Sequence, residues 1–172
     1  AYTISLFYKN LKTYLLAWFV AIPLSLALGG FWENFFLNLG FIEQDRVIGY
    51  FSDDDAYLDK IVEIKVGFRW DFLLYSAIGV FAGYYYIYKK HFEDVFYNRL
   101  FAIYLMCNAL WILVIRANFS NRFAYLSWFL LGLLVIYPLL KVSMFKKQHL
   151  LIGKILFIYF MFTYVLNFVL GK

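Results

Sequence analysis

The chain has 172 residues, of which 65% are hydrophobic, 24% aromatic and 16% charged, and its formal net charge is +5. A soluble domain of this length cannot bury so much apolar surface in one core, which excludes an ordinary soluble enzyme or binding domain. The composition therefore predicts a membrane protein that crosses the bilayer several times. Its basic residues are dispersed along the chain, so the net charge is no evidence for nucleic-acid binding.

Cysteine and histidine give no sign of a metal site. Cys107 is the single cysteine and lies inside an apolar run, so the chain cannot form an internal disulfide. His91 and His149 are far apart in sequence, without the spacing of metal ligands. The acidic run SDDDA is interpreted as part of a solvated loop, because adjacent acids cannot all face one calcium ion. We expect neither a metal nor an organic cofactor.

Five apolar segments approach the roughly 20 residues that a helix needs to cross a hydrocarbon core. Each should be α-helical, because a backbone in lipid must pair its own polar groups. In chain order they are Leu11–Leu28, Trp70–Tyr88, Leu100–Ile115, Phe123–Leu140 and Leu150–Leu170. Pro23 and Pro138 should kink the first and fourth segments.

Two further elements connect the first segment to the second. FWENFFLNL has Phe31, Phe35 and Leu39 at helical spacing, which predicts a short amphipathic helix in the membrane interface. The only long polar segment follows it, Gly40–Arg69, and is predicted to be a loop with room for one helix, since Ile61, Ile64 and Phe68 recur at intervals of three and four. The expected fold is an all-α polytopic helix bundle, with one domain that covers residues 1–172.

The orientation follows from the short connections, because lysine and arginine are retained on the cytoplasmic side. If the five helices alternate in direction, three basic groups fall on one side, which should be cytoplasmic. These groups are Lys9 and Lys12; Lys89, Lys90 and Arg99; and Lys141, Lys146, Lys147 and Lys154. The loop Gly40–Arg69 and the gap between the third and fourth helices would then face outward.

Three arginines occupy the predicted outer side, where this bias disfavours them. Arg116 and Arg122 bracket the gap IRANFSNRFAYL, and Arg69 marks the outer start of the second segment. A guanidinium group is always charged and binds phosphate oxygens with a planar fork, so three of them, predicted to share one outward-facing cavity, suit a diphosphate or sugar-phosphate group. Neutral side chains in the same gap would add hydrogen bonds, and these are Asn118, Ser120 and Asn121.

Structural explanations of these residues stay open. Arginines often end membrane helices by extending to lipid head groups, and Asn-Phe-Ser-Asn is also reasonable turn chemistry. Asp71 lies where an acid in the first turn is favoured by the helix dipole. Asn108, in the middle of the third segment, is interpreted as a hydrogen-bonding partner for a neighbouring helix, with a lipid groove as the alternative.

The run RWDFLLYSAIGVFAGYYYIYKK, followed by NRLFAIYLMCNALWILVIRANFSNRFAYLSWFLLGLLVIYPLL, resembles the C-terminal half of the EpsG-type polysaccharide polymerases, relatives of the Wzy O-antigen polymerases. The resemblance is clearest over Gly67–Leu140, and DRVIGYFSDDDA is similar to the preceding outer-loop segment. It implies that the chain is the C-terminal part of a longer polytopic protein with a GT-C-like fold.

The activity that this resemblance implies is metal-independent, inverting glycosyl transfer at the outer face of a bacterial inner membrane. Lipid-linked oligosaccharide repeat units would be joined there, with undecaprenyl diphosphate as carrier and leaving group. The arginines would hold the diphosphate, and Asp71 or, as a weaker alternative, Glu33 would accept the proton of the attacking hydroxyl. Flippase and chain-length regulator proteins are the partners it implies.

Two other functions remain open from the sequence. A lipid or oligosaccharide transporter should have polar residues along a whole crossing path. In a non-catalytic membrane subunit, the arginines would contact only lipid, and their side chains would point to different sides of the bundle.

Overall fold

The computed structural model describes residues 10–28, 31, 32, 35, 67–116, 121–165 and 168, and at positions 121, 122, 162 and 163 it describes the backbone alone. Within these ranges the chain is all-helical and contains five α-helices. They are α2 (Leu11–Leu28), α6 (Trp70–Tyr84), α7 (Val95–Leu113), α8 (Asn121–Lys141) and α9 (Gln148–Tyr164), and one π-helical turn, η1 (Tyr85–Lys89), continues α6. The all-α class is confirmed. The predicted interfacial helix and the outer loop up to residue 66 lie largely outside the described residues.

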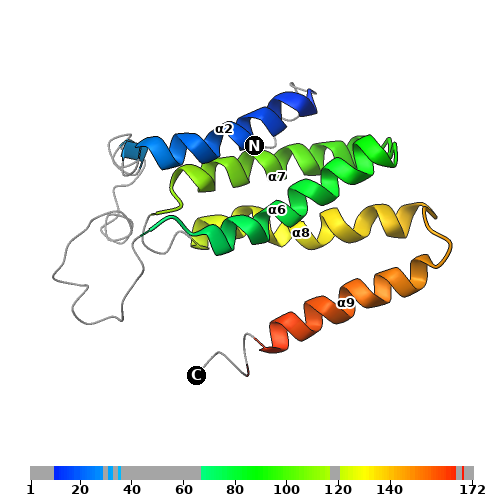
Figure 1. Ribbon diagram of the computed structural model, residues 1–172. Coiled ribbons are helices and arrows are strands. Elements are labelled where there is room, and N and C mark those ends of the chain that lie inside the picture. Colours follow the sequence, from blue (N-terminus) through cyan, green and yellow to red (C-terminus); the bar gives the residue numbers. More distant parts are fainter. Residues whose placement is uncertain are drawn as a thin grey trace.

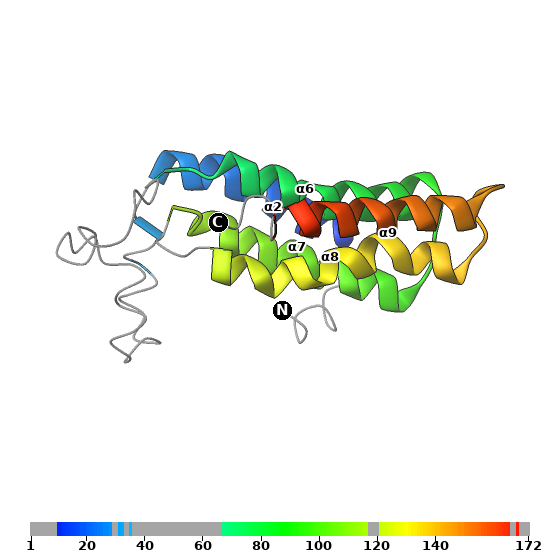
Figure 2. The same cartoon turned by 90° about the horizontal axis from the view of Figure 1, so that it is seen from below.

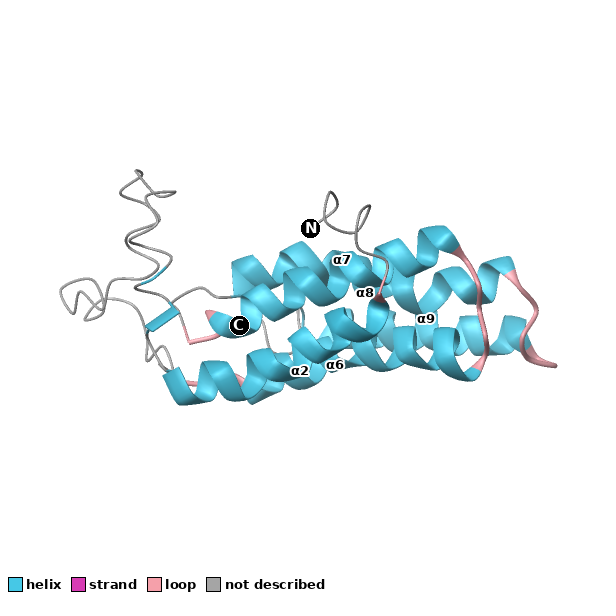
Figure 3. Cartoon of the chain, turned by 90° about the horizontal axis from the view of Figure 1, so that it is seen from above, coloured by secondary structure: helices cyan, strands magenta, loops and turns pink. Residues whose placement is uncertain are grey.

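The helices form a bundle in which successive elements run in opposite directions (Figure 1). Helix α7 is central and packs against α2, α6 and α8, while α6 also packs against α8. Helix α9 touches α8 more sparsely. The views from below and above show all five helix axes roughly aligned (Figures 2 and 3). Helix starts and helix ends therefore alternate at each end of the bundle.

Three of the described helices are long and apolar enough to cross a membrane: α2, α7 and the Phe123–Lys141 part of α8. This indicates a multi-pass membrane protein. Helices α6 and α9 have 15 and 17 residues, and η1 lengthens α6 by one turn.

Three helices begin before the predicted segments, and the last of them, α9, begins at Gln148 instead of Leu150. The third helix begins at Val95 instead of Leu100, because the Asp94 side chain accepts a hydrogen bond from the backbone N–H of Tyr97 at 2.8 Å and so caps the helix. The fourth begins at Asn121, which brings Arg122 into its first turn. The predicted first segment has the same bounds as α2.

Two glycines set the distance between α6 and α7. A Cβ atom at Gly79 would lie 2.6 Å from the ring of Tyr104, and one at Gly83 would lie 2.2 Å from the ring of Phe101. Both distances are shorter than van der Waals contact. Small residues four positions apart let membrane helices approach closely, and here two large, fully buried rings of α7 occupy the space.

Buried polar groups bond across the helices. Asn108 is fully buried on α7, where its Oδ1 accepts from Trp18 Nε1 of α2 at 2.7 Å and its Nδ2 donates to Ser127 Oγ of α8 at 3.0 Å. Ser76 of α6 accepts from Trp128 Nε1 at 2.8 Å. The interhelical role predicted for Asn108 is confirmed, and the lipid-groove alternative was wrong, because its side chain is enclosed by three helices.

Pro138 lies inside α8 and has no N–H, so the carbonyl oxygen of Leu134 loses its normal helical donor. The hydroxyl group of Tyr97 donates to this oxygen at 2.8 Å, and Tyr86 donates to the neighbouring carbonyl of Val135 at 3.1 Å. Because lipid offers no hydrogen bonds, the Tyr97 hydroxyl replaces the missing backbone partner of Leu134 from outside the helix.

The first test concerns the contact between α6 and α7. Replacing Gly83 by alanine should destabilise the chain by about 1–3 kcal/mol, because the new methyl group overlaps the Phe101 ring. Thermal unfolding in detergent measures this effect. Gly132→Ala is the matched control and should be neutral, because nothing lies within 4 Å of its added Cβ. A second change, Phe101→Leu, should restore much of the stability lost in Gly83→Ala; equal stability of the two glycine variants would contradict the packing.

The second test isolates the bond that compensates for Pro138. Tyr97→Phe should cost about 1 kcal/mol in the parent chain, since it leaves the Leu134 carbonyl without a donor. In a Pro138→Ala background, residue 138 supplies that donor, so the same tyrosine change should cost much less. A double-mutant cycle on unfolding free energy measures the difference. Additive effects would mean that Tyr97 does not act on this carbonyl.

Candidate functional site

The predicted outer residues come to one end of the bundle. Arg69 immediately precedes α6, Arg116 follows α7, and the backbone of Arg122 lies in the first turn of α8. Because neighbouring helices alternate in direction, these positions share the end where α2 and α7 stop and α6 and α8 start (Figure 1). Side chains at this end are described only for Arg69, Asp71 and Arg116 among the predicted site residues.

Arg69 and Asp71 form a two-point ion pair. The guanidinium donates from Nε to Asp71 Oδ1 at 3.0 Å and from Nη2 to Oδ2 at 2.7 Å, and its carbon lies 3.9 Å from the centre of the Phe72 ring. Arg69 has non-helical backbone angles, φ −85° and ψ 81°, so its side chain lies back over the first turn of α6. Both carboxylate oxygens of Asp71, the candidate base, therefore accept hydrogen bonds from Arg69, one of the residues predicted to bind the diphosphate.

Arg116 is directed to another helix. Its Nη2 donates to the carbonyl oxygen of Leu26 at 3.4 Å, one of the last four carbonyls of α2 that have no helical partner. A cation at a helix C-terminus is also favoured by the helix dipole. The Nε atom of Arg116 is buried and has no hydrogen-bond partner among the described residues. Arg116 thus caps α2 with one nitrogen and keeps donors for a further ligand.

The remaining predicted site residues cannot be placed in the same way. Glu33, Asn118 and Ser120 lie outside the described residues, as do the side chains of Asn121 and Arg122. Among the described residues, Arg69 and Arg116 donate to different acceptors, Asp71 and the carbonyl of Leu26. Their shared cavity stays a prediction. Also within that part, no three His, Cys, Asp or Glu side chains gather as metal ligands would.

Lysines gather at the opposite end, which the sequence predicts to be cytoplasmic. There Asp94 pairs with Lys141 at the end of α8, and Lys141 also donates to Tyr137 at 3.2 Å. The Lys141 hydrogen bond holds the pKa of the Asp94 carboxyl below its ordinary value, and the N–H of Tyr97 acts in the same direction. The Asp94 side chain has only 8% of its surface exposed, so this pair connects the start of α7 firmly to the end of α8.

The connection between α8 and α9 is held by Gln148. Its Oε1 accepts from the backbone N–H of Met144 at 2.7 Å, and its Nε2 donates to the carbonyls of Leu139 and of Val142. Donation from a side chain satisfies carbonyls at the end of α8. These hydrogen bonds tie α9 to α8 at the lysine-rich end, and Figure 1 shows α9 diverging from α8 beyond it.

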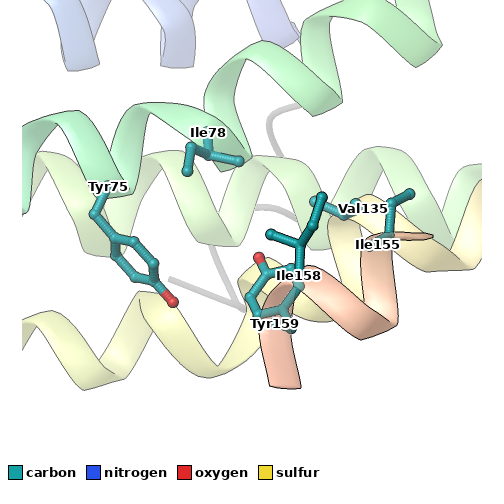
Figure 4. A pocket seen from close by; sticks show the side chains of 6 residues that line it. All are labelled: Tyr75, Ile78, Val135, Ile155, Ile158 and Tyr159. Carbon is teal, nitrogen blue, oxygen red and sulfur yellow. The ribbon is translucent and has the colours of Figure 1, made fainter. Parts of the chain in front are cut away.

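An apolar groove of about 300 Å³ results between α6, α8 and α9. Figure 4 shows the six side chains that line it: Tyr75, Ile78, Val135, Ile155, Ile158 and Tyr159. Neither Arg69 nor Arg116, the two arginines whose side chains are described at the other end, contributes to it. It lies along the middle of the helices, away from the ends that the charged residues occupy.

Comparison of the chain with models of protein families, with curated proteins and with solved structures found no match. The resemblance to the EpsG-type polymerases therefore stays a prediction.

Sequence reasoning did not identify the groove or the two glycines of the α6–α7 contact. The spacing Gly79-x-x-x-Gly83 was a usable signal for close helix packing. No comparable signal existed for the groove, because its six residues come from three helices and look like ordinary lipid-facing positions.

The third test uses the Asp94–Lys141 pair. Asparagine caps helices as well as aspartate does, so Asp94→Asn removes the ion pair and keeps the cap. The pKa of Asp94 is lowered in the folded chain, so its contribution to stability is present above the ordinary carboxyl pKa and disappears as pH falls through the folded pKa. We expect the parent chain to be the more stable at pH 7 and the difference to vanish in acid. Unfolding followed across pH measures this, and a constant difference would refute the ion-pair explanation.

Proposed function

We propose that the chain is the C-terminal helical part of a membrane glycosyltransferase that polymerises lipid-linked oligosaccharide repeat units. The observation that carries the proposal is the alternation of the helices, which brings Arg69, Arg116 and the backbone of Arg122 to one end, opposite the lysines. A site for a departing diphosphate needs fixed positive charge, and arginine supplies it without a metal. The products would be capsular, exopolysaccharide or O-antigen-like polymers.

The proposed site faces outward at the bacterial inner membrane, where undecaprenyl diphosphate is the leaving group. Arg69 and Arg116 each keep guanidinium N–H groups that can donate hydrogen bonds to phosphate oxygens. Asp71 holds Arg69 with both its oxygens, so its use as a base requires this ion pair to open. An incoming diphosphate competes for Arg69 and would release the carboxylate for the attacking sugar hydroxyl. Binding of the leaving group would in this way activate the base.

The transporter alternative has less support from the described residues. A transport path should present polar groups through the depth of the bundle. The buried polar side chains Ser76, Asn108 and Ser127 instead bond to neighbouring helices, where they join the bundle together. Among the described residues, the charged side chains lie within two turns of a helix end or in the connections between helices.

The fourth test is substitution in the complete protein, with the length of the surface polysaccharide as readout. Arg69→Ala and Arg116→Ala should each lower polymerisation by roughly tenfold or more, the effect of losing one charged hydrogen bond in a transition state. Arg116→Lys separates the capping of α2 from phosphate binding. Lysine retains a charged donor for the Leu26 carbonyl but lacks the planar fork that binds phosphate.

Arg99→Ala is the matched control, since Arg99 lies in the second turn of α7 at the opposite end. It should leave the polymer unchanged. The amount of each variant in the membrane is measured together with the polymer, so that a variant that fails to fold is recognised. Polymer of normal length in both alanine variants would refute the proposal.

A further inference from the structure

Two short connections lie side by side at the lysine-rich end of the bundle, as Figure 3 shows. Lys89 and Lys90 are at the junction of η1 with the connection to α7, and Lys146 and Lys147 are in the connection from α8 to α9. The ammonium group of Lys90 lies 4.4 Å from the centre of the Phe145 ring, so the two connections are in contact. These four lysines therefore belong to one surface, which we call the lysine surface.

The lysine surface keeps its positive charge. Glu93 and Asp94 follow Lys90 in the first connection, but Asp94 is paired with Lys141 at the end of α8. Within the described ranges, none of the four lysines forms an ion pair with Glu93 or with any other acid. Lys89, Lys146 and Lys147 are also exposed. An anion can therefore reach the surface without displacing a carboxylate of the chain.

Both connections are held in place by hydrogen bonds. In the second, Gln148 Oε1 accepts from the backbone N–H groups of Met144 at 2.7 Å and of Phe145 at 3.3 Å. In the first, the backbone N–H of Phe92 donates to the carbonyl of Tyr86 at 3.0 Å, and the Phe92 ring is buried. A ligand that binds to a fixed backbone costs less conformational entropy than one that must order a loop. The geometry therefore favours a localised site over a diffuse attraction.

Apolar side chains border the lysine surface. Leu140 and Val142 at the end of α8 and Leu150 at the start of α9 are all exposed. Helix α8 is one of the candidate membrane-crossing helices, so its end lies where hydrocarbon gives way to head groups. A ligand at this boundary meets apolar residues on one side and lysines on the other. An anionic lipid matches both, whereas an acidic protein segment matches only the charge.

From this arrangement we propose that the lysine surface binds the phosphate group of an anionic glycerophospholipid. The phosphate accepts hydrogen bonds from Lys90 of the first connection and from Lys146 of the second, and so joins them. The acyl chains lie against Leu140, Val142 and Leu150. Basic residues next to membrane-crossing helices attract anionic lipid head groups, which supports this choice of ligand. The site lies at the opposite end from the proposed diphosphate site and does not depend on the proposed function.

The fifth test is lipid retention. The full chain is placed in vesicles of phosphatidylglycerol and phosphatidylcholine in equal amounts and extracted with detergent, and native mass spectrometry counts the lipids of each class that remain bound. We expect phosphatidylglycerol to be retained in preference. Lys146→Gln should weaken its binding about fivefold, the equivalent of about 1 kcal/mol per basic residue. Lys146→Arg should preserve binding, because it keeps the charge.

Lys12→Gln is the matched control. It removes the same charge at the same end of the bundle, but from the first turn of α2, which Figure 1 shows at the opposite edge from α9. It should leave the retention of phosphatidylglycerol unchanged. Unfolding in detergent is measured for each variant, and Lys146→Gln should not alter it, because Lys146 is exposed.

Three results would overturn the proposal. The first is equal retention of the two lipid classes by the parent chain. The second is an equal loss in Lys146→Gln and Lys12→Gln, which would mean a diffuse attraction without a site. The third is tighter binding of a polyglutamate peptide than of phosphatidylglycerol, lost in Lys146→Gln, which would assign the lysine surface to an acidic protein segment instead.

Discussion

The hydrogen bond from Tyr97 to the carbonyl of Leu134 joins α7 to α8 where Pro138 interrupts the helical ladder. In water such a carbonyl would be solvated, but hydrocarbon supplies no donor, so leaving it unpaired has a net cost of about 1 kcal/mol. The observed register of α7 on α8 therefore supplies the donor that the proline removes. Asn108 sustains the same register from farther along α7, through Ser127. Polar groups specify which helices meet, and apolar packing fills the space between them.

Once α7 is in place, the positions of α6 and α9 follow from different constraints. Helix α6 approaches closely because Gly79 and Gly83 leave room for two aromatic rings. Helix α9 has no comparable contact and is held to α8 through Gln148 in the connecting turn. A helix fixed at one end can diverge from its neighbour at the other, and the groove is the space that this divergence leaves. The close contact of α6 with α7 and the groove beside α9 thus have separate physical causes.

Much of the fold could be predicted from the sequence, because long apolar segments in lipid have few alternatives to helix. The bounds of α2 and the position of Arg69 before α6 follow directly from composition. The Arg69–Asp71 pair could not be predicted, since residues two apart do not face each other on a helix. The pair forms because Arg69 lies just outside α6 with a non-helical backbone. The contact of Tyr97 with Leu134 could not be predicted from the sequence either, because it joins positions 37 residues apart.

The directions of the helices give the two described arginines different electrostatic surroundings. Helices α2 and α7 end where α6 and α8 begin, so this end of the bundle presents two negative and two positive dipole ends. Arg116 lies at the C-terminus of α2 and partly neutralises it through the Leu26 carbonyl. The adjacent N-termini of α6 and α8 instead favour an anion, and Arg69 is beside one of them. An anionic ligand at this end would therefore be stabilised most between the starts of α6 and α8, with Arg116 acting from the side.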